Sequence, residues 1–173
     1  MIPLLTSEIP DPTGWLVSIK MDGIRALWTG TALLTRHGRR LDPPKWFIQG
    51  LPARRLDGEL WMGNQTFPCL LSAIQTHSAS WAGIEFHVFD LAEVGTIEER
   101  IARLATIPLP THVHRVEHRI CSGMADLDRN ERKVVNAGGE GVVIRRPGSP
   151  YRPGRMGDVI KVKRLVADVD RPI

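Results

Sequence analysis

Short apolar runs that end in charged or turn-forming residues recur along this chain, and they constrain its fold more than any other feature. Runs of about four to eight residues, rich in Val, Ile, Leu and Trp, are typical of β-strands. The runs that predict strands lie at residues 15–19, 24–28, 32–35, 55–62, 84–91, 112–120, 141–145 and 159–163. The segment 147–158, PGSPYRPGRMGD, is rich in Pro, Gly and Arg, which favours a loop.

Helical patterns are fewer. One helix face is predicted by the i, i+3, i+4, i+7 spacing of Phe67, Leu70, Leu71 and Ile74. The capping box TIEE at 96–99 predicts a helix that extends to about residue 105. A short helix is expected to start near residues 43–47, and another to end at the glycines 138–139. Together these elements predict an α+β fold of antiparallel sheets with helices on their outer faces.

The bulk composition is typical of a globular protein with one domain. The 173 residues are 42% hydrophobic and 24% charged, with a net charge of +4. No apolar run approaches the roughly 20 residues that a membrane span needs, and the N-terminus lacks the pattern of a secretory signal. We therefore expect a cytoplasmic protein with no membrane contact. The positive charge fits a nucleic-acid partner, and a basic surface without a specific partner explains it equally well.

The cysteines and the clustered histidines match no strong motif. Cys69 and Cys121 are far apart in the sequence, so we expect two separate buried thiols. His112, His114 and His118 have spacings that a metal site could use. Because no cluster of cysteines or acidic residues accompanies them, we favour ordinary surface or partly buried histidines.

Lysine is rare in this chain, which makes each lysine informative. Only five of the 23 basic residues are lysines, which leaves 18 arginines. A lysine amine can lose its proton and act as a nucleophile, whereas an arginine effectively cannot. The lysines are Lys20, Lys45, Lys133, Lys161 and Lys163.

Pairs of charged residues sit two positions apart at predicted strand ends. Because residues i and i+2 point to the same side of a strand, Asp57 shares a face with Glu59, and Lys161 shares one with Lys163. Two lysines on one face repel each other. They require either full exposure to solvent or a compensating anion.

Five short motifs follow one another along the chain: KMDGIR at 20–25, LDGEL at 56–60, VFDL at 88–91, GEGVVIR at 139–145 and IKVK at 160–163. This ordered set, over about residues 15–165, resembles the covalent nucleotidyltransferase superfamily of ATP-dependent DNA ligases, RNA ligases and mRNA capping enzymes. The arginine of KMDGIR, the turn TRHG and the run EGVVIRRPGSPYRPGR most resemble DNA ligases of the minimal bacterial and phage type. The resemblance implies an ATP-grasp-like α+β nucleotidyltransferase fold.

The resemblance also implies an activity, that of an ATP-dependent DNA ligase. Lys20 would attack the α-phosphate of ATP to form lysyl-AMP. The AMP would then be passed to the 5′-phosphate of a DNA nick, and the 3′-OH of the nick would seal it. Lys20 can attack only as a neutral amine, and neighbouring cations would lower its pKa and stabilise the charged transition state. The catalytic residues implied are Lys20, Asp22, Glu140, Lys161 and Lys163.

The nucleotide site is implied in the same way. Phe89 would stack on adenine, Glu59 would hold the ribose, and Ser18 would lie near the adenine amino group. The full set is Ser18, Ile19, Lys20, Arg25, Arg36, Glu59, Phe89, Glu140, Lys161 and Lys163. The resemblance further implies Mg²⁺ or Mn²⁺, with Glu140 and Glu59 as its protein ligands.

Nicked double-stranded DNA is the partner implied. Arg25 and Arg36 match positions that touch ribose or the 5′-phosphate of the nick, and a guanidinium suits phosphate. Arg152 and Arg155, with Tyr151, lie on a loop suited to contacts with the DNA backbone, although a solvated turn is an equally good interpretation.

The end of the sequence departs from the usual family pattern. DNA ligases normally continue into an OB-fold that clamps the DNA, and the residues after Lys163 leave no room for one. We therefore expect residues 1–173 to form one adenylation domain without an OB-fold, as a monomer. The sequence leaves three explanations open: a part of a longer ligase, a naturally short ligase, and a ligase whose OB-fold or DNA-binding partner acts in trans. The alternatives are an RNA ligase-type enzyme, a GTP-using capping-type enzyme and a non-catalytic DNA-binding relic.

Overall fold

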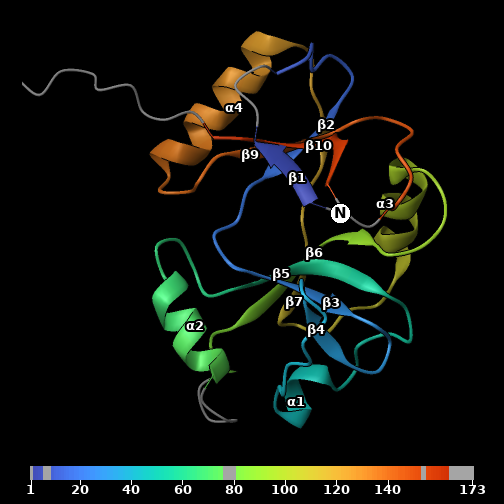
Figure 1. The fold of residues 1–173 in the computed structure, drawn as a ribbon, viewed down its shortest axis with the longest axis vertical. Coiled ribbons are helices and arrows are strands. Elements are labelled where there is room, and N and C mark those ends of the chain that lie inside the picture. The colour runs from blue at the N-terminus through green and yellow to red at the C-terminus, as the bar shows by residue number, and fades with distance from the viewer. Residues whose placement is uncertain (1, 6–8, 76–80, 153–154, 164–173) are drawn as a thin grey trace, which may run out of the picture.

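The computed structural model describes residues 2–5, 9–75, 81–152 and 155–163, which form two five-stranded sheets stacked along the long axis of the molecule (Figure 1). Sheet A has the strand order β1 (Ile2–Leu5), β10 (Arg155–Val162), β9 (Val142–Arg145), β2 (Leu16–Ile19), β8 (Arg119–Ile120). Sheet B has the order β4 (Leu33–Thr35), β3 (Ile24–Trp28), β5 (Leu56–Trp61), β6 (Glu85–Leu91), β7 (Val113–Arg115). The helices are α1 (Lys45–Ile48), α2 (Phe67–Gln75), α3 (Ile97–Thr106) and α4 (Met124–Asn136).

The predicted α+β class is confirmed, and each predicted strand region contains strand. Two details differ. The pairs β1–β10 and β6–β7 are parallel, so both sheets are mixed. The region 112–120 is not one strand but two, because the chain leaves sheet B after β7 and enters sheet A at β8.

The strand β10 begins earlier than predicted. Its first residues pair with β1 and not with β9, and the register joins Arg155 to Ile2. The Pro, Gly and Arg content of the preceding segment favoured a loop, and the pairing with a strand near the other end of the chain overrides that local preference.

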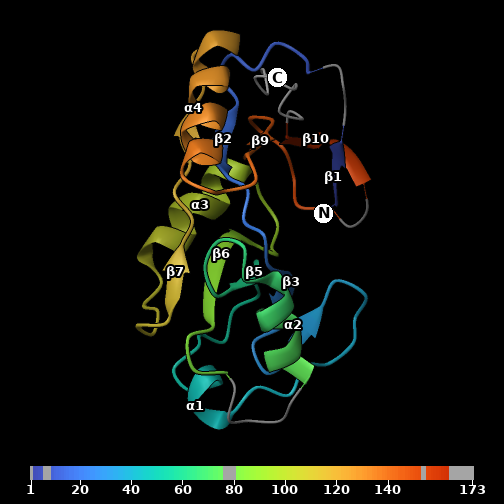
Figure 2. The same ribbon diagram turned by 90° about the vertical axis from the view of Figure 1, so that its left-hand side faces the viewer.

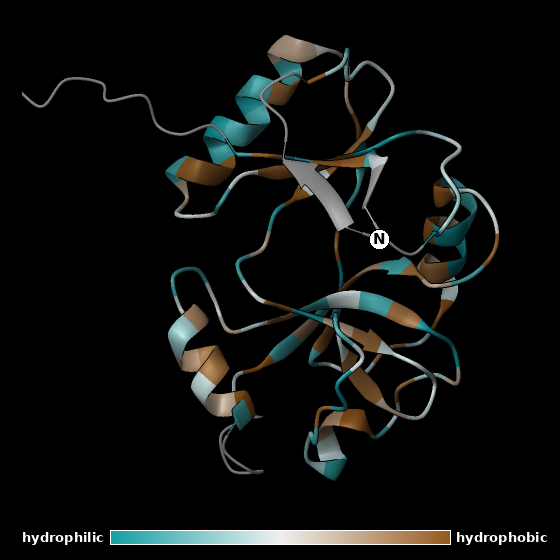
Figure 3. Cartoon of the chain, in the orientation of Figure 1, coloured by the Kyte–Doolittle hydropathy of each residue, from teal (hydrophilic) through white to brown (hydrophobic). Residues whose placement is uncertain are grey.

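Helices cover one face of each sheet. Figure 3 shows hydrophobic and hydrophilic stretches alternating along these helices. Figure 2 shows α4 along the outer side of sheet A. The core there is made of Trp15, Val17, Cys121, Leu127, Val142, Ile144, Ile160 and Val162. Sheet B buries one face against α1 and α2, which contribute Phe47, Leu70 and Ala73 to the core. Strand alternation then leaves the opposite face of each sheet free to carry polar side chains.

The helix predictions hold with one correction. The capping box at Thr96 and Glu99 is present, and α4 ends before Gly138, whose φ of 82° is left-handed. In α2, however, the buried positions are Leu70 and Ala73, whereas Phe67 and Leu71 of the predicted stripe are 37% and 40% exposed. The helix therefore turns a narrower face to the core than the apolar spacing indicated.

The two thiols lie in different surroundings. Cys121 is buried in the core of sheet A, but Cys69 is exposed, so the expectation of two buried thiols is wrong for Cys69. None of the described helices has the length and apolar character that crossing a membrane requires.

Gly58 in β5 provides a test of how closely β5 and β6 approach each other. A Cβ at this position would lie 2.5 Å from the carbonyl oxygen of His87 and 2.7 Å from the ring of Phe86. We expect Gly58→Ala to lower the free energy of unfolding by about 1–3 kcal/mol, measured by urea denaturation. The control Gly157→Ala, where a Cβ meets nothing within 4 Å, should change it by less than about 0.5 kcal/mol. Equal effects of the two variants would contradict the packing described.

Candidate active site

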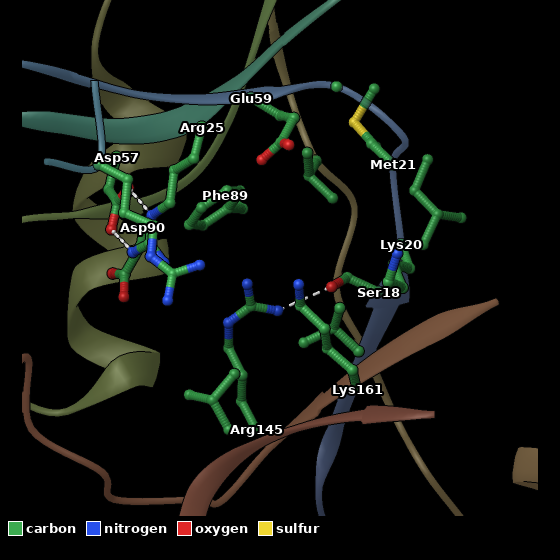
Figure 4. Close-up of a pocket in the computed structure, with 16 residues that line it drawn as sticks. Ser18, Lys20, Met21, Arg25, Asp57, Glu59, Phe89, Asp90, Arg145 and Lys161 are labelled. Atoms are coloured by element: carbon green, nitrogen blue, oxygen red, sulfur yellow. Dashed lines mark hydrogen bonds and ion pairs between the residues drawn. The ribbon is translucent and has the colours of Figure 1, made fainter. Parts of the chain in front are cut away.

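A cleft of about 230 Å³ lies between the polar faces of the two sheets (Figure 4). Eight of the predicted site residues line it: Ser18, Ile19, Lys20, Arg25, Arg36, Glu59, Phe89 and Lys161. The remaining lining residues are Met21, Gly23, Asp57, Asp90, Val116, Val143, Arg145 and Val159. Side chains that are far apart in the sequence therefore converge on one cavity.

Sheet A supplies one wall through its strand register. Ser18 of β2 pairs with Val143 of β9, and Val143 pairs with Lys161 of β10, so the three side chains form one row on the cleft face. Arg145 and Val159 form part of the next row on the same face. Alternating residues of these strands point into the core under α4, which leaves the cleft face polar.

Sheet B supplies the opposite wall. Arg25 of β3 pairs with Glu59 of β5, and both line the cleft. The guanidinium of Arg25 donates two hydrogen bonds to Asp57, from Nε at 3.0 Å and from Nη2 at 2.5 Å. This bidentate pair holds Arg25 against the carboxylate of Asp57, which is only 1% exposed. The sequence had predicted that Arg25 contacts ribose or phosphate.

Lys20 lies in the segment that crosses from sheet A to sheet B. Its backbone N–H donates to the carbonyl of Gly141 at 2.8 Å, which extends the pairing of β2 with β9 by one residue. Its ammonium forms an ion pair with Glu140, whose carboxylate also accepts from Lys163 at 3.3 Å. Glu140 and Lys163 therefore do not line the cleft. They are connected to it because Glu140 contacts both Lys20 and Lys163.

The neutral form of Lys20 is more accessible than that of an ordinary lysine. Burial and the positive charges of Lys161 and Lys163 lower the pKa of Lys20 to about 8, although Asp22 and Glu59 oppose this shift. The side chain is 12% exposed. An amine with this pKa is deprotonated to a useful extent near neutral pH, as nucleophilic attack requires.

Glu59 is shifted in the opposite direction. Burial raises the pKa of Glu59 to about 7, against the opposing charges of Arg25 and Lys161. Near neutral pH this carboxyl therefore exchanges between acceptor and donor forms. It can hydrogen-bond a hydroxyl-rich ligand in either state.

Phe89 presents a ring between two cations. The guanidinium carbons of Arg25 and Arg145 lie 5.4 Å and 5.1 Å from its centroid. Contacts of this kind hold an aromatic ring in place. The half-buried ring lines the cleft and offers a flat apolar surface to a ligand.

Arg145 is the main site residue that sequence reasoning missed. It is 6% exposed and donates to the hydroxyl of Ser18 at 2.7 Å. Burial lowers the pKa of Arg145 to about 10, so it stays charged at neutral pH. The available signal was a charged residue at the end of the apolar run 141–145, two positions after Val143 on the same strand face.

A network around two buried carboxylates that line the cleft, Asp57 and Asp90, was also missed. Asp90 accepts hydrogen bonds from Arg100 of α3 at 2.7 Å and 3.0 Å. The phenol of Tyr151 donates to Asp57 at 2.7 Å. Tyr151 was expected to contact the DNA backbone, and the structure turns it toward the cleft. Burial and the Asp57 charge raise its pKa.

The remaining predicted residues have separate positions. Asp22 is half-buried and does not line the cleft, although its charge acts on Lys20. Arg36 lines the cleft and is exposed, on the turn after β4. Arg152 is exposed and outside the cleft, whereas the side chain of Arg155 lies outside the described part of the structure.

The three histidines do not share a site. His112 contacts the backbone carbonyl of Phe47 at 2.7 Å, and His114 lies 3.4 Å from Glu85. Burial and the charge of Arg145 lower the pKa of His118 to about 3, so its imidazole is neutral. These three histidines thus lie in separate surroundings, and His114 is grouped with Glu85 and His87.

The sequence matches a known protein family and a known enzyme. The model of the ATP dependent DNA ligase domain matches residues 55–163. The DNA ligase of Haemophilus influenzae is 34% identical over 155 residues. The chain belongs to the ATP-dependent DNA ligase domain family.

Solved structures show the same fold. A Lig E DNA ligase superposes with a TM-score of 0.86 at 29% identity, covering 94% of this chain and 68% of the other. A Chlorella virus DNA ligase-adenylate gives a TM-score of 0.78 at 22% identity, with 94% and 66% covered. The predicted nucleotidyltransferase fold is thereby confirmed.

This ligase domain corresponds to part of its relatives. It spans 58% of the Haemophilus influenzae ligase, which covers 87% of this chain. The range matched by the family model starts after KMDGIR, so the interpretation of Lys20 rests on the geometry of the cleft.

The lowered pKa of Lys20 can be measured without any assumption about activity. We expect amine acylation at Lys20, followed by peptide mass spectrometry, to rise with pH through a midpoint near 8. Ordinary lysines titrate near about 10.4. In Lys161→Met the midpoint should move to higher pH because one repelling cation is lost. Lys133→Met, on α4, is the control and should leave it in place. A wild-type midpoint at the ordinary lysine value would contradict the electrostatics described.

Proposed function

We propose that this domain acts as the adenylation domain of an ATP-dependent DNA ligase, with Lys20 as the residue that carries AMP. The observation that carries the proposal is the placement of a low-pKa amine in a cleft beside an aromatic ring and several cations. This combination suits a purine nucleoside triphosphate. The base needs a flat apolar contact and the phosphates need positive charge.

The first reaction is nucleotidyl transfer to the protein. The Nζ atom of Lys20 forms a bond to the α-phosphorus of ATP as the bond from that phosphorus to the β-bridging oxygen breaks. Pyrophosphate leaves with the electron pair, and the attacking nitrogen loses a proton. Glu140, which is paired with this amine, is an acceptor for that proton.

The cations of the cleft stabilise the charge that develops in this step. Lys161 lies in the same row as Ser18, two residues before Lys163, so both ammonium groups can face the phosphoryl oxygens. Arg145 adds a buried charge near Phe89. Phe89 would hold the adenine and Glu59 the ribose, as the family resemblance implies.

Magnesium or manganese would be held by the carboxylates of Glu59, which lines the cleft, and Glu140, which contacts Lys20. Among the described residues no three side chains in the cleft form a group with the spacing of metal ligands. Mg²⁺ is usually held by one or two carboxylates together with substrate phosphates and water. Such an ion would supply positive charge that polarises the phosphates.

The later steps would use the outer part of the cleft. Arg36 is exposed at its rim, where a guanidinium can hold the 5′-phosphate of a nick. Arg152, which is exposed on the loop after β9, would contact the DNA backbone. Asp22, close to Lys20 in the crossing segment, would steer the 3′-OH or a metal ion.

The central test is covalent labelling of the purified domain. We expect incubation with Mg²⁺ and ATP to give a species heavier by one AMP in intact-mass spectrometry. Lys20→Ala should abolish this species, and Lys45→Ala, an exposed lysine in α1, should retain it.

Several outcomes would overturn parts of the proposal. Absence of the AMP adduct on the native domain would support a non-catalytic DNA-binding relic. Labelling by GTP in preference to ATP would indicate a capping-type enzyme. Faster sealing of nicked RNA than of nicked DNA duplexes would indicate an RNA ligase-type enzyme.

Phe89 provides a test of base stacking. We expect Phe89→Ala to raise the KM for ATP in the labelling reaction by roughly 5- to 150-fold, the equivalent of one lost base–aromatic stack. Phe89→Tyr should restore most of the affinity because it keeps the ring. Phe67→Ala, at an exposed position on α2, is the control. An unchanged KM in Phe89→Ala would exclude Phe89 as the stacking surface.

A further inference from the structure

The polar row that includes Glu59 continues beyond the cleft. Register joins Arg25 of β3 to Glu59 of β5, Glu59 to His87 of β6, and His87 to His114 of β7. Directly paired residues in neighbouring strands point to the same face of the sheet. Two imidazoles therefore lie side by side on this face, at the end of the row opposite to Arg25.

Glu85 joins the two imidazoles. It lies two residues before His87 on β6 and so shares its face. One carboxylate oxygen, Oε2, is 2.8 Å from Nε2 of His87, and the other, Oε1, is 3.4 Å from Nε2 of His114. The rings of the two histidines are 5.0 Å apart between centroids.

The three side chains have the donor spacing of a metal site. One potential ligand atom from each lies within 4.8 Å of the others, and no other such group of three occurs among the described residues. In a tetrahedral site with bonds of about 2.1 Å, neighbouring donors lie about 3.4 Å apart, so only small side-chain movements are needed. Two imidazoles and one carboxylate are a ligand set that Zn²⁺ and related ions favour, whereas Mg²⁺ prefers oxygen ligands alone.

We propose that Glu85, His87 and His114 bind one divalent transition-metal ion of the Zn²⁺ class. The side chains of Glu85 and His114 are each 41% exposed and that of His87 is 15% exposed, so the ion can enter from solvent and keep water as a fourth ligand. The ring of Trp61 packs edge-on against His87, with centroids 5.2 Å apart, and fixes its orientation.

The ion would link two parallel strands, β6 and β7. His87 and Glu85 belong to β6, which also carries Phe89 and Asp90 of the cleft, and His114 belongs to β7. Because the site exists only when β6 and β7 are paired, binding would stabilise the folded state. The site is separate from the nucleotide cleft, since none of its three ligands lines that cleft.

The test is metal binding to the tag-free full chain without nucleotide. We expect isothermal titration with Zn²⁺ to show one ion per chain. His114→Ala and Glu85→Gln should each weaken Zn²⁺ binding by at least about tenfold. Mutation of a residue that only hydrogen-bonds to a metal ligand already weakens metal binding by about that factor, so loss of a ligand should weaken it at least as much. His37→Ala, an exposed histidine on the turn after β4, is the matched control and should bind as the wild type does.

A second measurement reports the ligand geometry directly. Co²⁺ in place of Zn²⁺ should give the visible absorption bands of a four-coordinate site in the wild type and in His37→Ala, and lose them in His114→Ala. Equal Zn²⁺ affinity in the wild type and both ligand variants, or no stoichiometric binding, would overturn the proposal and leave Glu85 as an ion-pair partner only. Neither result depends on whether Lys20 becomes adenylated.

Discussion

The pairing of β9 with both β2 and β10 is the constraint on which the cleft depends. The hydrogen bond from the backbone of Lys20 to Gly141 ends the β2–β9 ladder, and Glu140 immediately precedes Gly141. The same ladder aligns Ser18, through Val143, with Lys161. One set of backbone hydrogen bonds therefore brings the amine, its carboxylate partner and the neighbouring cation together from three distant segments of the chain.

The charges in the cleft follow from this geometry. Burial favours the neutral forms of both Lys20 and Glu59, and the close cations lower both pKa values. Asp57 is paired with Arg25, and Asp90 with Arg100, so the deep carboxylates are largely compensated. Arg145 donates to a neutral hydroxyl and keeps its charge. The cleft thus retains positive charge where a polyphosphate would bind.

The sequence predicted the local parts of this arrangement better than the non-local ones. Motif residues within strands were placed correctly in the cleft because alternation along a strand is a local property, as Ser18 of β2 and Lys161 of β10 illustrate. Arg145 was missed because its role depends on the partner strand that brings Ser18 beside it. The parallel pairing of β1 with β10 likewise joins opposite ends of the chain, and no local propensity reports it. The metal-ligand group escaped notice because His114 meets Glu85 and His87 only through the β6–β7 register.

The central claim is that the nitrogen of Lys20 bonds directly to the phosphorus of AMP. Phosphorus-31 NMR of the protein after incubation with ATP and Mg²⁺, and removal of free nucleotide, tests this bond itself. We expect a single protein-bound phosphoramidate signal that disappears on mild acid treatment and is absent from Lys20→Ala. A phosphate-ester signal, or a phosphoramidate signal that persists in Lys20→Ala, would contradict it.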